Sequence, residues 1–371
     1  MRGDQLRVYH LARALAHHAE VRLVCFAADD EEPLPDVPIV TVERSAAATA
    51  LGNLAAPDPR LPLQTRLFLD RGMRRSIQAE TERFEPDVVH VTLARMGPYA
   101  TGLRSDAHVH LDFVDALSLN MSSRAEGSRP PLRQALAAEA ALMRSYEGRL
   151  AAAVDSCSVV AERDRTASPG LERAAVVPNG VNTETFAFRD PAERPERLLF
   201  FGNLGYFHNV WPARTVALDV LPLLREQRPA AELRIAGARP AQGVRELADL
   251  DAVELRIDVP DMAAELHHAA VAVLPMASGS GMKNKVLEAF ATGTPVVTNR
   301  AGIAGIDDAV EGKHYLGGET PAEMADACAR LLAEPGERTR LAEAAAALVQ
   351  SNFSWDSRAK QLLGIYAGTR A

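Results

Sequence analysis

The feature that most constrains the fold is a regular alternation of short apolar runs with segments of helical periodicity. In the first half of the chain, the apolar runs 21–26, 88–92 and 108–113 are separated by helix-like segments. The same alternation restarts at 198–201 and continues through 269–275. This pattern predicts α/β architecture with parallel sheets, whose strands are buried on both faces. A length of 371 residues fits about two domains.

A polar stretch without periodicity marks the expected domain boundary. We expect a first domain at 1–182, a linker at 183–195 and a second domain at 196–352. The first domain lacks an apolar run before the turn at Gly3, where an α/β domain of this kind places its first strand. A missing central strand leaves neighbouring backbone groups unpaired, at a cost of about 1–3 kcal/mol each. We therefore expect the natural protein to begin about ten to twenty residues upstream, unless the sheet lacks this strand.

One strand–loop–helix unit has the composition of a phosphate site. The apolar run 269–275 leads into the glycine-rich segment 277–283 and then into a helical pattern. Two of the four lysines in the chain, Lys283 and Lys285, lie here, against 37 arginines elsewhere. Backbone N–H groups and the helix dipole favour an anion at such a helix start, and lysine adds a charge. The alternative is a solvated charge run with a Lys285–Glu288 pair, worth about 0.2–0.5 kcal/mol.

Composition excludes several classes of protein. A net charge of −8 argues against a nucleic-acid binder. Three scattered cysteines, at 25, 157 and 328, indicate reduced core residues of a cytoplasmic protein and form no zinc motif. No apolar run approaches the ~18 residues of a membrane span. The pairs His17-His18 and His267-His268 diverge on their helices, so we expect no metal site.

A basic amphipathic pattern covers residues 63–83. It carries five arginines, at 66, 71, 74, 75 and 83, beside apolar residues, and predicts one long helix. Such a helix can contact anionic lipid or a phosphorylated acceptor. The acidic net charge favours an ordinary half-buried helix over membrane contact.

Several motifs together resemble retaining glycosyltransferases of family 4, and most closely the sugar transferases of bacterial exopolysaccharide clusters. The C-terminal motifs are Phe-Phe-Gly-Asn-Leu-Gly-Tyr-Phe-His-Asn at 200–209, Gly-Met-Lys-Asn-Lys-Val-Leu-Glu-Ala at 281–289 and Gly-Thr-Pro-Val-Val at 293–297. Pro-Asn-Gly-Val-Asn at 178–182 is similar to the hinge motif of the family. The resemblance implies the GT-B fold, with two facing Rossmann-like domains and a C-terminal helix, 353–371, that crosses back to the first domain.

The resemblance also implies a donor site in the second domain. Lys285 would stabilise the leaving diphosphate, and Glu288 would accept the ribose hydroxyls. The remaining donor contacts implied by the motifs are Gly202, Asn203, Val259, Ser280, Gly281, Met282, Lys283 and Val286. Two positions depart from the family: Ser280 stands where a glutamate is usual, and Asn203 where many members carry arginine.

On the acceptor side, Gly3, Asp4 and Arg7 resemble the first loop of the family. Asp115 falls near a strand end where members often carry histidine, and a carboxylate there could stabilise an oxocarbenium-like transition state. The alternative for Asp115 is a helix N-cap or turn residue. Asp112, close by, is interpreted as structural.

These observations predict a cytoplasmic glycosyltransferase that moves a sugar from a nucleotide sugar to a small-molecule, saccharide or lipid-linked acceptor. UDP is the expected nucleotide, with GDP and dTDP as alternatives, and no metal or other cofactor is expected. A GT-B-type nucleotide-sugar epimerase and a non-catalytic nucleotide-sugar-binding protein are the alternative functions.

Overall fold

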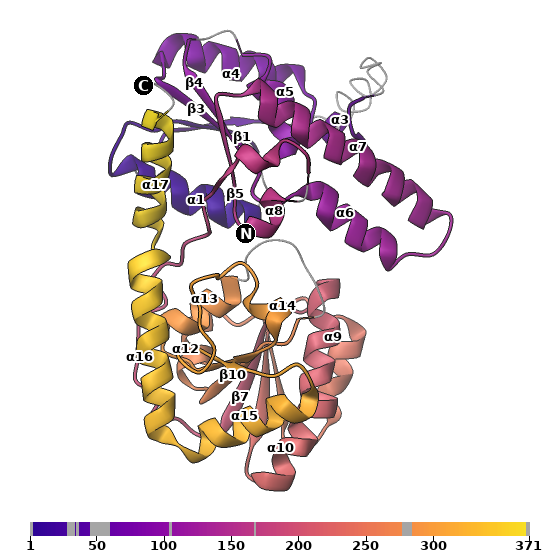
Figure 1. Ribbon diagram of the computed structural model, residues 1–371, viewed down its shortest axis with the longest axis vertical. Helices are drawn as coiled ribbons and strands as arrows, with labels where there is room; N and C mark the ends of the chain where they lie inside the picture. The colour runs from indigo at the N-terminus through magenta and orange to yellow at the C-terminus, as the bar shows by residue number, and fades with distance from the viewer. Residues whose placement is uncertain are drawn as a thin grey trace. The chain divides into compact units, whose positions relative to one another are not determined.

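The computed structural model describes residues 3–27, 34, 37–44, 60–103, 106–166, 168–276 and 284–368. The chain forms two compact units. Unit 1 contains residues 1–179 and 355–371, and unit 2 contains residues 180–354. The chain therefore passes from one unit to the other twice, at 179/180 and at 354/355 (Figure 1).

Unit 1 is built from parallel strands alternating with helices. Its two parallel ladders have the orders β1-β2 and β3-β4-β5-β6. Its elements are α1 (Gly3–Ala16), β1 (Leu23–Phe26), β2 (Ile39–Val42), α3 (Leu63–Arg66), α4 (Arg71–Phe84), β3 (Val88–Thr92), η1 (Ala94–Met96), α5 (Gly97–Ala100), β4 (His108–Asp112), α6 (Leu117–Glu126), α7 (Leu132–Ala153), β5 (Ser156–Val159), α8 (Glu162–Arg165), η2 (Leu171–Arg173), β6 (Ala175–Val176) and α17 (Trp355–Gly368).

Within the described residues, the parallel strands of unit 1 form two separate ladders. Within the described ranges, no ladder joins β1 to β3. Every residue of β1 and β3 is only half-buried, whereas all of β5 is buried. Strands without a partner on one edge keep part of their surface open, which explains this difference.

The sequence analysis made two predictions about helices of unit 1, one of which is wrong and one of which is confirmed. The predicted long helix 63–83 is wrong: α3 ends at Arg66, and α4 begins only after Asp70, whose side chain accepts a hydrogen bond from the Met73 N–H. An aspartate is a strong N-cap, so it starts a new helix here. The return of the C-terminal helix to the first domain is confirmed, because Leu362 of α17 packs with Leu11 of α1 in a buried cluster (Figure 1).

Unit 2 has one six-stranded parallel sheet, in the order β12-β11-β10-β7-β8-β9. The central residues of β7 and β8 and all of β10 are buried, as expected for strands covered on both faces. The elements of the unit are β7 (Arg197–Asn203), α9 (Phe207–Thr215), the π-helix η3 (Val216–Val220), α10 (Leu221–Gln227), β8 (Glu232–Ala238), α11 (Gln242–Arg245), η4 (Glu246–Asp249), β9 (Val253–Ile257), α12 (Met262–His267), β10 (Val271–Val273), α13 (Asn284–Ala291), β11 (Val296–Thr298), α14 (Arg300–Ile303), β12 (Leu316–Gly317), α15 (Pro321–Ala333) and α16 (Pro335–Asn352).

The stretch 183–195, expected as a linker, is fastened to unit 2 by two arginines. Arg194 donates hydrogen bonds to the carbonyls of Leu266 and Ala269, at 3.1 and 3.2 Å, and to Thr294 Oγ1, at 2.9 Å. Arg338 of α16 donates to the carbonyl of Pro191 at 3.2 Å. A segment held in this way belongs to the body of unit 2, and the crossings between the units lie at its two ends, 179/180 and 354/355.

Candidate functional site

The candidate site lies at the carboxyl edge of the unit 2 sheet, where the strand order reverses. The chain runs outward through β7, β8 and β9 and then returns to place β10 on the other side of β7. In an open α/β sheet, ligands bind beyond the carboxyl ends of the strands at such a reversal. Here the reversal lies between β7, which ends at Asn203, and β10, which is followed by the lysine-containing loop.

Two glycines allow the ends of β7 and β8 to approach each other closely. Gly202 has φ +142° and Gly237 has φ +154°. A Cβ on Gly237 would lie 1.8 Å from the Gly202 carbonyl oxygen. A Cβ on Gly202 would lie 3.2 Å from both Lys285 Nζ and Asn209 Nδ2. The space in front of β7 is therefore kept open by the absence of side chains.

Lys285, in the first turn of α13, reaches this space. Its Nζ donates a hydrogen bond of 2.8 Å to Asn209 Oδ1 and lies 5.0 Å from the centre of the Phe200 ring. The Asn209 Nδ2 in turn donates to the carbonyl of Asn203 at 2.8 Å. The ammonium is thus positioned by an amide that is itself anchored to the end of β7.

Asn209 contacts Lys285 and is a candidate site residue that the sequence reasoning did not single out. It is buried, with 8% of its surface exposed, in the first turns of α9. Its only signal in the sequence was its place as the last residue of the motif at 200–209. A role as partner of Lys285 needs the spatial contact between two helices, which the sequence does not display.

Glu288 lies three residues beyond Lys285 on α13, so the two share a helical face. Burial raises the pKa of Glu288 to about 7, although the nearby positive charge of Lys285 acts to lower it. Among the described residues, no hydrogen-bond donor is fixed on its carboxylate. A half-buried carboxyl of this kind can accept hydrogen bonds from ligand hydroxyls, which would offset its desolvation.

The other predicted donor residues have different environments. Asn203 is exposed, and its Oδ1 accepts from the Gly205 N–H at 3.2 Å. Val259 is half-buried just beyond β9, where the Asp258 N–H donates to the Gly237 carbonyl at 3.0 Å. The side chain of Val286 is fully buried in the core, so only its backbone is available to a ligand. Ser280, Gly281, Met282 and Lys283 lie outside the described residues.

Arg7, predicted as an acceptor residue, is instead a buried structural residue of unit 1. Only 1% of its surface is exposed. Its Nε donates to Asp112 Oδ2 at 2.7 Å, and its Nη atoms donate to Asn179 Oδ1 at 2.8 Å and to the carbonyl of Val177 at 3.0 Å. Its guanidinium joins α1 to the end of β4 and to the segment that leaves the unit. This arrangement also agrees with the structural interpretation of Asp112.

The remaining acceptor candidates are Gly3, Asp4 and Asp115. Gly3 and Asp4 lie in the first turn of α1, so the expectation of a loop at these residues is wrong. Asp115 is half-buried and follows Val114, which has a left-handed φ of +62°. Such a backbone conformation is strained for a β-branched residue, and strained residues are often found at functional sites.

Three histidines, of which His108 and His110 are buried, form a polar cluster beside Asp112. His110 makes hydrogen-bond contacts with Ser156 Oγ at 2.7 Å and Ser158 Oγ at 2.9 Å. His108 contacts the same Ser156 Oγ at 2.8 Å, and His90 contacts the Tyr366 hydroxyl of α17 at 2.7 Å. Burial lowers the pKa of His110 to about 3, and burial also lowers the pKa of His90. His110 is therefore neutral at neutral pH, and the cluster connects α17 to β3 and β4.

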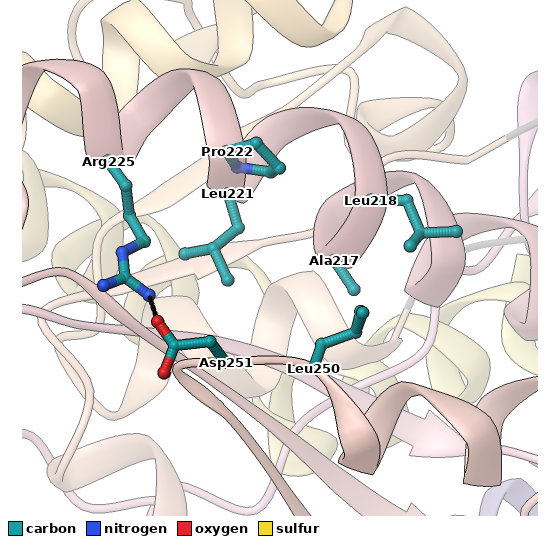
Figure 2. A pocket seen from close by; sticks show the side chains of 7 residues that line it. All are labelled: Ala217, Leu218, Leu221, Pro222, Arg225, Leu250 and Asp251. Atoms are coloured by element: carbon teal, nitrogen blue, oxygen red, sulfur yellow. Dashed lines mark hydrogen bonds and ion pairs between the residues drawn. The ribbon is translucent and has the colours of Figure 1, made fainter.

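A surface cavity of about 340 Å³ lies elsewhere on unit 2. Figure 2 shows its lining of aliphatic side chains from η3 and α10, with the Arg225–Asp251 ion pair of 2.7 Å at one end. Leu250 and Asp251 precede β9, so the cavity lies toward the amino ends of the strands. Apart from this ion pair, its lining side chains are apolar. The site with glycines, Lys285 and Glu288 is the stronger candidate on chemical grounds.

Comparison with known proteins identifies the class of enzyme. Residues 195–334 match the family model described as glycosyl transferases group 1. The chain is 28% identical to a glycogen synthase of Mycobacterium tuberculosis, over 98% of this chain and 90% of that protein. The chain is a glycosyltransferase. It is also 30% identical to a D-inositol 3-phosphate glycosyltransferase of Pseudarthrobacter chlorophenolicus, over 60% of this chain and 57% of that enzyme.

Solved structures establish the fold of this glycosyltransferase. A sucrose-phosphate synthase from Thermosynechococcus elongatus superposes with a TM-score of 0.70 at 18% identity, covering 99% of this chain and 93% of that one. The Anabaena protein HepE, in complex with UDP-glucose, superposes with a TM-score of 0.70 at 12% identity, covering 99% and 96%. The fold is GT-B, and the resemblance to family 4 glycosyltransferases is confirmed at the level of the group 1 domain and this fold.

Two structural features are absent from the described residues. No helix there combines the length and apolar character needed to cross a membrane. Nor do three or more His, Cys, Asp or Glu side chains come together there in a way that could hold a metal ion.

Proposed function

We propose that this glycosyltransferase binds a nucleoside-diphosphate sugar in unit 2 and transfers the sugar with retention to an acceptor bound in unit 1. The observation that carries the proposal is the group formed by Gly202, Asn209, Lys285 and Glu288 at the strand-order reversal of the unit 2 sheet. The complexes of HepE with UDP and with UDP-glucose support UDP as the nucleotide, with GDP and dTDP as alternatives.

In this proposal, each residue has a defined task. The bond between the anomeric carbon and the terminal diphosphate oxygen breaks, and its electron pair leaves with the diphosphate. The acceptor hydroxyl oxygen bonds to the anomeric carbon, and its proton passes to the departing phosphate oxygen. Lys285, oriented by Asn209, stabilises the charge that develops on the diphosphate. Glu288 accepts the ribose hydroxyls, and we assign to Asp115 the task of stabilising the positive charge that develops on the sugar.

No step of the proposal requires a metal ion, because lysine and backbone N–H groups supply the positive charge on the diphosphate. We also propose a cytoplasmic location, where nucleotide sugars are available. None of the three cysteines forms a disulfide in the structure, which supports that location.

Calorimetry with UDP, GDP and dTDP tests the donor site first, with Lys285→Ala as the matched variant. We expect one nucleotide to bind clearly tighter than the others, and the variant to lose most of that affinity. Equal and very weak binding of all three would overturn the donor assignment. Incubation with the corresponding nucleotide sugars then distinguishes the reactions: slow release of nucleotide indicates transfer, an isomerised donor without release indicates an epimerase, and neither product indicates a binding protein.

A further inference from the structure

The segment 113–118 joins β4 to the first turn of α6, and three carboxylates hold its backbone. Three alternate N–H groups of the segment each donate a hydrogen bond to a different carboxylate side chain. The bonds run from the Val114 N–H to Asp112 Oδ1 at 3.2 Å, from the Ala116 N–H to Asp164 Oδ1 at 3.2 Å, and from the Ser118 N–H to Glu147 Oε1 at 3.1 Å. Asp115, to which the proposed function assigns the charge on the sugar, lies in the middle of this segment.

All three carboxylates are completely buried, and they come from different elements. Asp112 is the last residue of β4, Glu147 lies in α7 and Asp164 lies in α8 (Figure 1). Glu147 also accepts hydrogen bonds from the hydroxyls of Ser118, at 2.6 Å, and Ser168, at 2.5 Å. A carboxylate is costly to bury unless hydrogen bonds offset its desolvation. Three of them on one short segment indicate that its backbone is held in a defined conformation.

The backbone of this segment is also strained. Val114 has a φ of +62°, which is unfavourable for a β-branched residue. Its carbonyl accepts a hydrogen bond from the Val160 N–H at 2.9 Å, and its side chain packs with Val160 and Ala161 in a small buried cluster. A strained conformation persists only where the surrounding structure over-determines it. The carboxylates and this apolar cluster supply such contacts.

Asp115 differs from its neighbours in burial. It is half-buried, whereas every other residue of 111–118 is buried. Helix α6 begins at Leu117 and has Ala116 at its N-cap position, with no side-chain cap. Asp115 is therefore not the N-cap of α6, and Glu147 of another helix accepts an N–H from the first turn instead.

We propose that Asp164 and Glu147 are positioning residues, which fix the backbone directly after Asp115 and so hold its carboxyl in place for the reaction. The inference rests on the proposed function, in which Asp115 stabilises the positive charge that develops on the sugar. Both positioning side chains are completely buried and act through the N–H groups of Ala116 and Ser118, so neither has to touch a substrate.

The test compares substitutions that keep the acceptor oxygen with substitutions that remove it. Asp112 is left intact, because it also binds Arg7. Asp164→Asn and Glu147→Gln keep an oxygen that can accept the backbone N–H, whereas Asp164→Ala and Glu147→Ala remove it. Release of UDP from UDP-glucose by the full chain, measured in the steady state, gives kcat and KM for each variant.

We expect both alanine variants to lower kcat about 10- to 100-fold with an unchanged KM, because a displaced catalytic group impairs the reaction and not the binding of the donor. The Asp164→Asn and Glu147→Gln variants should keep most of the wild-type kcat. A rise in KM with an unchanged kcat would overturn the proposal.

Ser168→Ala is the matched control. It removes a hydrogen bond to Glu147 Oε2 but leaves the bond between Glu147 Oε1 and the Ser118 N–H, so kcat should not change. Hydrogen–deuterium exchange adds a second readout: the amides of 114–118 should exchange faster in the two alanine variants and at the wild-type rate in the control. Because α8 has only four residues, Asp164→Ala is the milder truncation, and it carries the test if Glu147→Ala does not fold.

A double-mutant cycle separates positioning from a general loosening of unit 1. Asp164→Ala should lower kcat in the wild type but add little in an Asp115→Ala background, since it acts through Asp115. A full additional loss in that background would overturn the proposal. So would an equal loss from Asp164→Asn and Asp164→Ala, because the charge and not the hydrogen bond would then be responsible.

The same series keeps this inference separate from the proposed function. If Asp115→Ala lowers kcat but neither Asp164→Ala nor Glu147→Ala does, the task of Asp115 stands and the positioning proposal alone is overturned. If Asp115→Ala leaves kcat unchanged, the task assigned to Asp115 fails, and the positioning proposal fails with it.

Discussion

At the scale of single residues, the donor site depends on how a neutral amide orients a charge. The Asn209 amide oxygen fixes the ammonium of Lys285 beside Gly202 without neutralising it. Removing that ammonium should cost about 2–4 kcal/mol of transition-state stabilisation, by analogy with the loss of an oxyanion donor. We therefore expect Lys285→Ala to lower kcat/KM by about 10²–10³-fold, measured from nucleotide release in steady-state assays.

Two further variants test the register of the loop and the role of Asn209. Lys283→Ala should cost far less than Lys285→Ala, because Lys285 shares a helical face with Glu288. Asn209→Ala should have an intermediate effect that disappears in the Lys285→Ala background, since the amide acts through the lysine. A larger loss from Lys283→Ala would show that the wrong lysine has been assigned to the diphosphate.

Glu288 should make both donor binding and stability depend on pH near neutrality. Its pKa of about 7 lies above the ordinary value of 4.5, so the folded protein binds the proton more tightly than the unfolded chain. This contribution to stability is complete below pH 4.5 and is lost as the pH rises to 7 and above. We expect Glu288→Gln to be more stable than the wild type at pH 8 in urea unfolding, while its nucleotide affinity is lower. If the variant were less stable at pH 8, the ionised carboxyl of Glu288 would not be destabilised by desolvation in the folded protein.

At the scale of secondary-structure elements, the histidine cluster should make unit 1 sensitive to acid. The pKa of His110 is held at about 3, below its ordinary value of 6.5, so the unfolded chain binds protons that the folded unit excludes. Stability is therefore fully present above pH 6.5 and falls as the pH drops toward 3, by up to about 1.4 kcal/mol per pH unit for one histidine. The pKa of His90 is shifted in the same direction.

Trp355 of α17 reports on this unit, because it packs in the cluster that joins α17 to α1. In a Trp211→Phe background it is the only tryptophan of the chain, which has two. We expect its urea midpoint to fall steeply between pH 7.5 and pH 5, and His110→Asn to flatten that dependence. An unchanged slope in the variant would assign the acid sensitivity to other groups.

The elements also show what a sequence can and cannot predict. The apolar runs that became β7 and β10 were recognisable because a strand buried on both faces has few polar residues. The break between α3 and α4 was missed because arginines and apolar residues continue through it at helical spacing, while the N-cap of α4 depends on the single side chain of Asp70. Arg7 was misassigned for a related reason: its partners Asp112 and Asn179 are more than one hundred residues away in the chain.

At the scale of the whole molecule, the two-fold repetition of the α/β pattern predicted the fold class, and the motifs at 200–209 and 281–289 predicted the enzyme class. The division of the chain into units was harder to predict. The stretch 183–195 has a linker-like composition, yet Arg194 and Arg338 bind it to unit 2 through backbone carbonyls. Composition does not reveal such contacts, because any carbonyl can serve as the acceptor.

Two compact units joined by two chain crossings should unfold in two transitions, and a ligand should stabilise only the unit that binds it. A nucleotide at one hundred times its Kd stabilises its unit by about 2.7 kcal/mol. We expect calorimetry to show that the nucleotide raises the transition of unit 2, while the transition followed by Trp355 fluorescence in Trp211→Phe stays in place, because Trp355 belongs to unit 1. A shift of the Trp355 transition alone would place the donor in unit 1 and contradict the site at Lys285. A single transition, shifted as a whole, would show instead that the two units unfold as one cooperative body.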